Sequence, residues 1–152
     1  MAQSFAAMVD QWTRDSEARL LAVFQRAVEL LADELGLSRS NGGRTPYRTG
    51  NLVRSLVARI GDMPGQGGPD QKYAGSDVGA VVAQAILGDA ISLGFQANYA
   101  RRMNYGFVGM DETGRLYNQA GAGFVEYAAS VWPTIVELAA EEIKGQVMGR
   151  AV

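Results

Sequence analysis

The 152-residue sequence predicts an α+β protein in which long helices near the two ends of the chain pack on a small antiparallel β-sheet. Three observations predict this class. Apolar residues recur at helical spacing near both ends, a central apolar run has the pattern of a β-hairpin, and two glycine-rich stretches interrupt the middle. The length suits one domain over 1–152, with an N-terminal helical region (1–36), a central region (37–123) and a C-terminal helical region (124–152).

Residues 5–35 have the pattern of an amphipathic helix, with Ser4 as the expected N-cap and Gly36 as the glycine just past its end. The charged block "TRDSEAR" at 13–19 interrupts the apolar stripe, so the segment forms either one helix or two. One helix over this range would be roughly 46 Å long, whereas a compact domain of this size is about 40 Å across. A continuous helix would therefore protrude or bury one end against another subunit.

Turn sequences and a short amphipathic run follow the first helix. Residues 37–50 contain Asn-Gly-Gly and Thr-Pro and are expected to form a loop. Residues 51–60 begin either as a short helix with Thr49 as its cap or as a strand. We favour a helical turn through about Ser55, followed by a strand at Leu56–Ile60.

The strongest β pattern lies between 80 and 97. The runs "VVAQAIL" and "AISLGFQ" flank Gly88-Asp89, which is a two-residue turn of the hairpin type. Pairing across this turn would place Ile86 opposite Ile91 and Val82 opposite Phe95, on one apolar face. The sequence therefore predicts a β-hairpin here.

The remaining segments complete the prediction. Residues 61–79 and 107–123 are glycine-rich and without periodicity, and we expect two long loops, which at this length are usually functional or disordered. A short helical element is expected at 98–106. Helical spacing returns at 124–148, where Pro133 must kink or restart the helix.

Composition argues against catalysis. The chain has no Cys and no His, which excludes disulfides and cysteine nucleophiles and removes the commonest general base and metal ligand. The glycine stretches "GQGGPD" and "GAGF" lack the remaining features of nucleotide-binding loops. We therefore expect no enzyme activity, no catalytic residue, no cofactor and no metal. With no apparent signal or membrane span, the expected setting is soluble and intracellular, without membrane contact.

Positive charge gathers in one segment. Five arginines and no acid lie between 39 and 59: Arg39, Arg44, Arg48, Arg54 and Arg59. Arg101 and Arg102 lie close to Tyr99 and Tyr105. Arginines contact phosphates and tyrosines stack on bases, so an alternative function is a small nucleic-acid-binding domain using 39–59. The net charge of −2 is unusual for a dedicated binder of this kind.

Within this segment, "TPYRTGNLVRSL" resembles the signature Pro-x-Arg-Thr-Gly-x-Leu-x-x-Ser of tail-completion, or head–tail joining, proteins of long-tailed double-stranded DNA bacteriophages. The matching positions, in order, are Pro46, Arg48, Thr49, Gly50, Leu52, Ser55, Tyr99-Ala100, Tyr105-Gly106 and Phe124. The resemblance covers roughly 40–128. It departs from the family at Asn104, where an acidic residue is usual nearby, and at Gly123, where Pro is frequent.

The resemblance implies a structural virion protein of the phage neck, assembled in the host cytoplasm. Such a subunit forms a homo-oligomeric ring, commonly a hexamer, between the head–tail connector or stopper protein and the tail terminator or tail tube protein. Genome DNA passes through the lumen without sequence-specific binding. No catalysis and no cofactor are implied.

Charge distribution suggests how such copies would meet. Residues 39–59 carry +5, whereas 120–152 carry four acids and two bases, a net −2. The arginines are therefore candidates for docking on Glu137, Glu141 and Glu142 of a neighbouring copy. The interaction candidates are Arg44, Arg48, Thr49, Gly50, Arg54, Arg59, Tyr99, Arg101, Arg102 and Tyr105. The motif could equally serve folding, and a generic assembly or adaptor domain with a coincidental match is a third interpretation.

Overall fold

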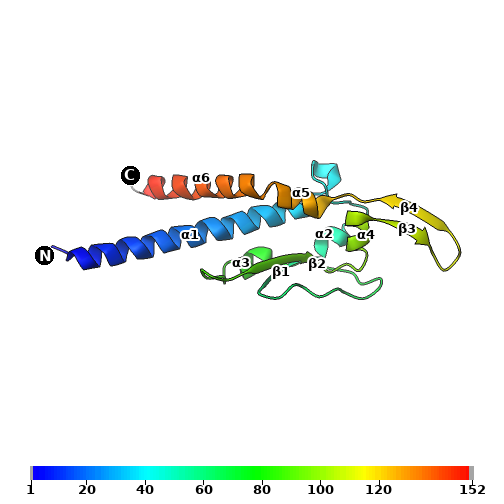
Figure 1. The fold of residues 1–152 in the computed structure, drawn as a ribbon, viewed down its shortest axis with the longest axis horizontal. Coiled ribbons are helices and arrows are strands. Elements are labelled where there is room, and N and C mark those ends of the chain that lie inside the picture. Colours follow the sequence, from blue (N-terminus) through cyan, green and yellow to red (C-terminus); the bar gives the residue numbers. More distant parts are fainter. Residues whose placement is uncertain (1, 151–152) are drawn as a thin grey trace.

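The computed structural model describes residues 2–150, which fold as an α+β protein with long terminal helices, as predicted (Figure 1). The helices in this range are α1 (Phe5–Gly36), the 3-10 turn η1 (Arg39–Asn41), α2 (Asn51–Arg54), α3 (Val78–Val82), α4 (Ala100–Tyr105), α5 (Phe124–Ser130) and α6 (Trp132–Arg150). The strands form two separate antiparallel pairs, β1 (Leu56–Ile60) with β2 (Ile91–Phe95), and β3 (Gly106–Met110) with β4 (Leu116–Ala120).

Helix α1 is one continuous helix of 32 residues, about 48 Å long. Ser4 is its N-cap, as predicted, and its hydroxyl accepts a hydrogen bond from the Ala7 N–H at 3.2 Å. Gly36 was expected just past the helix, which is wrong: Gly36 is the last helical residue, and Leu37 is the C-cap. The charged block at 13–19 does not break the helix, because this part of α1 is largely exposed to solvent.

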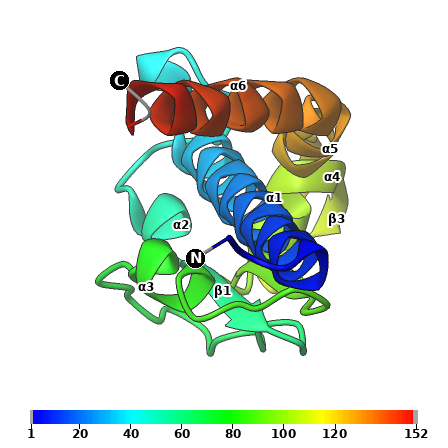
Figure 2. The same cartoon turned by 90° about the vertical axis from the view of Figure 1, so that its left-hand side faces the viewer.

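Helix α6 packs on α1, and the two helices lie side by side with the described chain ends at the same end of the molecule (Figures 1 and 2). Small buried side chains, Ala27 on α1 and Ala139 on α6, allow close approach, and Ile135 fills the space beside them. The predicted restart at Pro133 is confirmed. Val131 separates α5 from α6, and Pro133 lies in the first turn of α6, where its missing N–H costs no helical hydrogen bond.

Strand β1 is confirmed, but the predicted hairpin across Gly88-Asp89 is wrong. Residues 78–82 form α3, and β2 pairs with the distant β1, so that Leu56 lies opposite Phe95. The Asp77 carboxylate caps α3 by accepting the Ala80 N–H at 3.0 Å. In place of the predicted pairings, Val82 is fully buried in a helix and Ile86 is exposed.

The second glycine-rich segment was expected to be a loop, and this is also wrong for most of its length. It forms the β3–β4 hairpin, which extends away from the helices beyond α4 and α5 (Figure 1). The predicted short helix α4 is confirmed. It ends at Tyr105, and Gly106 is its C-cap, with a φ of +89° that favours glycine. The first glycine-rich loop is confirmed over 61–77, because α3 begins at Val78.

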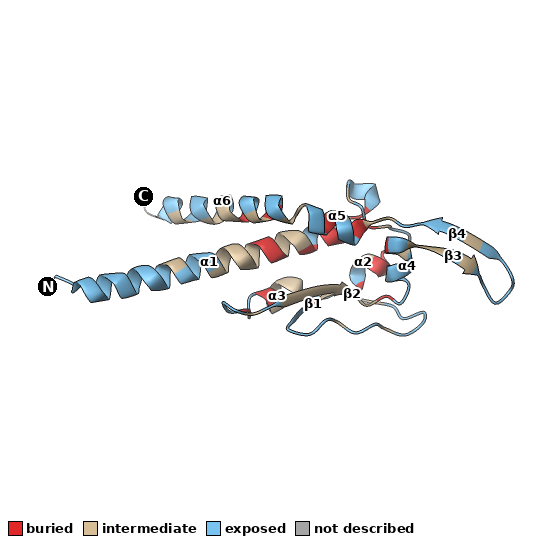
Figure 3. Cartoon of the chain, viewed as in Figure 1, coloured by how far each residue is buried: buried red, intermediate tan, exposed pale blue. Residues whose placement is uncertain are grey.

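Buried residues concentrate where α1, β1, β2 and α5 meet, whereas the first half of α1 and the β3–β4 hairpin are mostly exposed (Figure 3). Phe124, at the start of α5, is buried and contacts Phe95 edge to face, with ring centroids 5.2 Å apart. The core therefore holds the middle of the molecule and leaves both of its ends uncovered.

Candidate functional site

The Arg-Thr-Gly motif forms a tight turn into α2. Gly50 is the N-cap of this helix and has φ +78°, a left-handed backbone conformation that residues other than glycine rarely adopt. Thr49 was expected to be the cap, which is wrong by one position, although its hydroxyl accepts a weak hydrogen bond from the Asn51 N–H at 3.4 Å. The buried Ser55 closes α2 by donating its hydroxyl to the Leu52 carbonyl at 2.7 Å.

Arg54 and Asn51 then tie the motif to the long loop at 61–77. The guanidinium of Arg54 donates to the Tyr73 carbonyl at 2.9 Å and to the Thr49 carbonyl at 3.2 Å. The Asn51 side chain receives the Tyr73 N–H at 2.9 Å and donates to the Gln71 carbonyl at 3.0 Å. These bonds to main-chain atoms fix the course of the loop, so these two motif residues contribute to folding.

The same residues line a hollow of about 450 Å³, whose walls include Thr49, Asn51, Arg54, Gln71, Lys72 and Tyr99. The hydroxyl of Tyr99 accepts a hydrogen bond from the Asn51 amide at 3.2 Å. An adjoining hollow of about 230 Å³ is lined by Arg48, Gly50 and Tyr99 among others. The structure thus brings together five of the predicted residues, namely Arg48, Thr49, Gly50, Arg54 and Tyr99.

The other predicted arginines lie elsewhere. Arg44 stacks on the ring of Tyr127 in α5, with 4.3 Å from its guanidinium carbon to the ring centroid, and Arg102 stacks in the same way on Phe107 at 4.4 Å. Arg59 is exposed on β1. Two of the five arginines of 39–59, Arg44 and Arg54, therefore contact other parts of their own chain.

Arg101 and Tyr105 lie on α4 beside a further hollow of about 200 Å³, which β2 and α5 also line. Asn104, between them, is buried. Its amide donates to both carboxylate oxygens of Glu126 at 3.0 and 2.7 Å, and its carbonyl oxygen accepts the Val125 N–H at 3.0 Å. The bond from Asn104 lowers the pKa of Glu126, and Glu126 in turn raises the pKa of the exposed Tyr105 hydroxyl.

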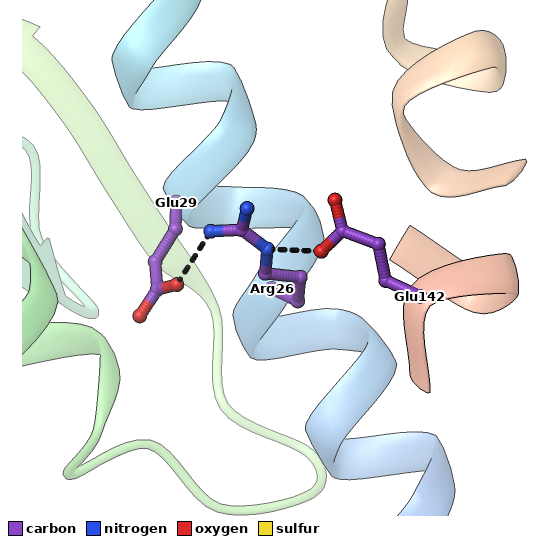
Figure 4. Close-up of polar contacts among 3 residues, drawn as sticks. All are labelled: Arg26, Glu29 and Glu142. Atoms are coloured by element: carbon purple, nitrogen blue, oxygen red, sulfur yellow. Dashed lines mark hydrogen bonds and ion pairs between the residues drawn. The ribbon is translucent and has the colours of Figure 1, made fainter. Parts of the chain in front are cut away.

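One acidic group proposed as a docking partner is already paired. Glu142 on α6 accepts a hydrogen bond from the Arg26 guanidinium at 2.6 Å, and Glu29 accepts a second from Arg26 at 3.2 Å (Figure 4). The bond from Arg26 lowers the pKa of Glu142. Glu137 and Glu141 are exposed and make no ion pair within residues 2–150, so they stay available to a neighbour.

Sequence reasoning missed two features of this region. The anchoring role of Asn51 depends on bonds to carbonyls of a loop, which carry no sequence signal. Asn104 stands out in the sequence only as a departure from the pattern of the family that the motif resembles, although its buried side chain joins α4 to α5. A polar residue in place of the usual acid, with Glu126 available as a partner, was the signal that could have found it.

Between residues 2 and 150, no group of three or more acidic side chains is placed to hold a metal ion. No helix in the same range is long and apolar enough to cross a bilayer. Comparisons with protein-family models, curated proteins and solved structures found no match to this chain.

Proposed function

We propose that this chain is a structural subunit of the neck of a long-tailed bacteriophage. Copies of it would form a ring, with six copies expected, that joins the head–tail connector or stopper protein to the tail terminator or tail tube. Such a subunit acts by protein–protein contact and not by catalysis. The ordered series of motif residues from Pro46 to Phe124 supports this function, and so does the distribution of exposed apolar side chains.

That distribution is the observation that carries the proposal. On the exposed end of α1, Phe5, Met8, Val9 and Trp12 follow the spacing of one helix face, and Phe5 and Trp12 are 78% and 70% exposed. At the opposite end of the molecule, the β3–β4 hairpin exposes Val108, Met110 and Leu116 (Figure 1). Monomeric proteins rarely expose large apolar patches, which usually mark interaction surfaces.

Two different surfaces on one chain are what a ring requires. In a head-to-tail contact, one surface of each copy meets a different surface of the next, and the ring closes if the rotation between copies closes. The length of α1 supports the same proposal. The first turns of α1 extend beyond the described end of α6 (Figure 1) and are exposed, so binding another molecule would bury them.

Nucleic-acid binding by 39–59 is less well supported. Arg54 is bonded to backbone carbonyls and Arg44 is stacked on Tyr127, so a basic surface would have to be assembled from the remaining arginines. Passage of genome DNA through a ring requires no such dedicated surface.

The proposal is tested on the purified chain and on particles of a phage that encodes it. We expect closed rings in negative-stain electron micrographs, and antibody label at the head–tail junction of the particles. A chain that stays monomeric and binds duplex DNA with a steep salt dependence would support the alternative. Particles without label at the junction would contradict the neck assignment.

A further inference from the structure

Strand β2 has a free edge. In an antiparallel pair, hydrogen-bonded and non-bonded residue pairs alternate. Gln96 donates to Ser55 at one end of the pair and Gly61 donates to Ala90 at the other, which fixes the alternation along β1 and β2. The N–H and C=O groups of Ile91, Leu93 and Phe95 therefore point away from β1. Within residues 2–150 these groups have no hydrogen-bond partner.

An apolar groove runs beside this free edge. It has a volume of about 470 Å³, its floor includes Phe24, Val28 and Leu31 of α1, and α5 contributes Val125 and Ala128 to its wall. The hollow beside Tyr105 continues it along Phe95, because Leu35, Leu93 and Val125 line both. A strand placed here would find unpaired backbone on one side and an apolar floor beneath it.

Strand β3 has the two properties that such a strand needs. Asp111 donates to the Arg115 carbonyl next to the hairpin turn, so the same alternation makes the backbone groups of Val108 and Met110 point outward, whereas the Gly106 N–H donates to the Arg102 carbonyl at the end of α4. These residues also share one side-chain face, on which Val108 is 74% and Met110 65% exposed. On β4, the corresponding outward residues include the polar Asn118, which suits an apolar groove less well.

The hairpin does not fill the groove of its own chain. It continues from α4 away from the β1–β2 pair (Figure 1). A second copy can bring its hairpin to this groove, and each copy offers both a strand and a groove. The contact is therefore head-to-tail and repeats from copy to copy.

We propose that β3 of one copy adds to β2 of the next copy as a third, antiparallel strand. The pairing places Met110 opposite Ile91 and Val108 opposite Leu93, and it ends before Gly106, whose N–H donates to the Arg102 carbonyl. Side chains of paired residues lie on the same face, so Val108 and Met110 enter the apolar groove beside Leu93 and Phe95, which pack toward α1. Strand addition of this kind obtains affinity from main-chain bonds and specificity from side-chain pockets.

The addition would also stabilise both sheets. An isolated two-stranded sheet is only marginally stable in water, whereas a sheet of three strands with an apolar face is more stable. The inference rests on the proposed function in one respect, since it requires copies of this chain to meet. Beyond the ring itself, it specifies that β3 of one copy binds the free edge of β2 of the next.

Disulfide trapping tests the pairing, because the natural chain has no cysteine. Val108→Cys and Leu93→Cys are made in separate chains, mixed and mildly oxidised. Residues directly opposite in a sheet are close enough for a disulfide, so we expect a cross-linked dimer of one chain of each kind. The matched control replaces Val108→Cys by Asn118→Cys, the cross-strand neighbour on the same hairpin face, and we expect much less cross-linking.

Absence of the Val108–Leu93 cross-link, or equal linking of Asn118→Cys, overturns the inference. If another protein's strand fills the groove, Leu93→Cys stays unlinked in the purified mixture, and the pairing between copies is overturned in the same way. Electron microscopy of the same samples separates the two proposals. Rings without the cross-link leave the neck function standing, whereas cross-linked dimers that never close into rings support the strand pairing and contradict the ring.

A second pair of variants tests the main-chain hydrogen bonds between β3 and β2 of the next copy. Val108→Pro and Asn118→Pro each remove one outward-facing N–H from the hairpin, where proline on a free edge is tolerated. We expect Val108→Pro to weaken self-association by about tenfold, the effect of losing roughly one hydrogen bond, and Asn118→Pro to change it little. Circular dichroism of both variants serves as the control for correct folding. Equal effects of the two variants would overturn the strand pairing.

Discussion

Arg26 and Glu142 are 116 residues apart in the sequence, and the guanidinium Nε of the first lies 2.6 Å from the carboxylate Oε2 of the second. The pair joins the middle of α1 to α6 (Figure 4). Ala27, the next residue of α1, is buried in one cluster with Ala139 of α6. Beyond α6, α1 continues uncovered to its amino-terminal end (Figure 1). The ion pair therefore lies in the part of α1 that its own chain covers, and the remainder is open to a partner.

The first prediction concerns the pH dependence of this pair. Because Arg26 lowers the folded-state pKa of Glu142 below its ordinary value of 4.5, the stabilisation is present above that value and is lost as the pH falls through the folded pKa. We expect Glu142→Gln to melt at a lower temperature than the natural chain at pH 7 and low salt. The two melting temperatures should converge in acid, where Glu142 is protonated.

Glu141→Gln is the matched control for this prediction, because it removes the same charge from the same helix without breaking an ion pair. Both groups of the Arg26–Glu142 pair are partly exposed, so the difference should be small and should shrink with added salt. Identical pH profiles for Glu142→Gln and Glu141→Gln would show that the ion pair contributes no stability.

The second prediction concerns Gly50. Alanine at this position would adopt a left-handed conformation and place its Cβ 2.6 Å from a guanidinium nitrogen of Arg54. We expect Gly50→Ala to lower the free energy of unfolding by about 1–3 kcal/mol. Gly145→Ala, in the middle of α6 with open space around it, should raise this free energy by roughly 0.5–1 kcal/mol. Urea unfolding of both variants measures the contrast, and equal shifts would contradict it.

Local patterns explain which elements the sequence predicted. The helical period and the Ser4 cap act within a few residues, so α1 was predictable. The same holds for the strand after α2, where a turn is followed by an apolar run. The β2 prediction failed differently. Gly88-Asp89 is a sound local turn signal, but the best partner for Ile91–Phe95 is β1, more than thirty residues earlier, and a sheet register with distant strands has no local signature.

The β3–β4 hairpin was missed because glycine and polar residues weaken its alternation. Gly109 and Asn118 interrupt the apolar pattern, and the turn between the strands is longer than two residues. The contacts of the Arg-Thr-Gly motif were also only partly predictable from the sequence. Its arginines identified the right region, but the contacts of Arg54 are to backbone carbonyls, and any residue type supplies those.

The third prediction exchanges the chemistry of Asn104 and Glu126. Asn104→Asp alone would place two carboxylates within hydrogen-bond distance of each other, so we expect the melting temperature at pH 7 to fall by about 5 °C. Adding Glu126→Gln restores a pair of one amide and one carboxylate, in which position 126 now donates and position 104 accepts. The carboxylate introduced at position 104 can still accept the Val125 N–H. We expect the double variant to recover most of the loss.

Thermal melts of the natural chain, the two single variants and the double variant form a complete cycle. Glu126→Gln alone measures the loss of the natural pairing without a repulsive contact. If the double variant is as unstable as the sum of the single variants, the two side chains are not coupled, and the joint between α4 and α5 depends on other contacts.

The fourth prediction separates the folding and docking roles of the motif. Arg54 holds the Tyr73 carbonyl, whereas Arg48, six positions earlier, makes no side-chain hydrogen bond within residues 2–150. We expect Arg54→Gln to increase the rate of proteolysis within 61–77, and Arg48→Gln to leave that rate unchanged. Limited proteolysis with mass spectrometry of the fragments measures it.

The same two variants report on docking. If Arg48 meets the exposed acids of a neighbouring α6, Arg48→Gln should weaken self-association without changing the proteolysis of the loop. Charge reversal by Arg48→Glu should weaken it further, since it faces Glu137 and Glu141 with a like charge. Unchanged association of Arg48→Glu would remove this arginine from the candidate docking residues.

The last prediction concerns the exposed face of α1. Trp12 is largely exposed, so Trp12→Ser removes little buried area within the monomer and should leave its melting temperature nearly unchanged. If this face binds another subunit, the same change removes a large aromatic anchor from the contact, and losses at such positions commonly exceed about 1 kcal/mol. Analytical ultracentrifugation should then show at least about tenfold weaker assembly. Gln11→Ser, a polar change at the adjacent position, should assemble normally, and an equal loss in both variants would indicate general weakening of the helix and not a binding face.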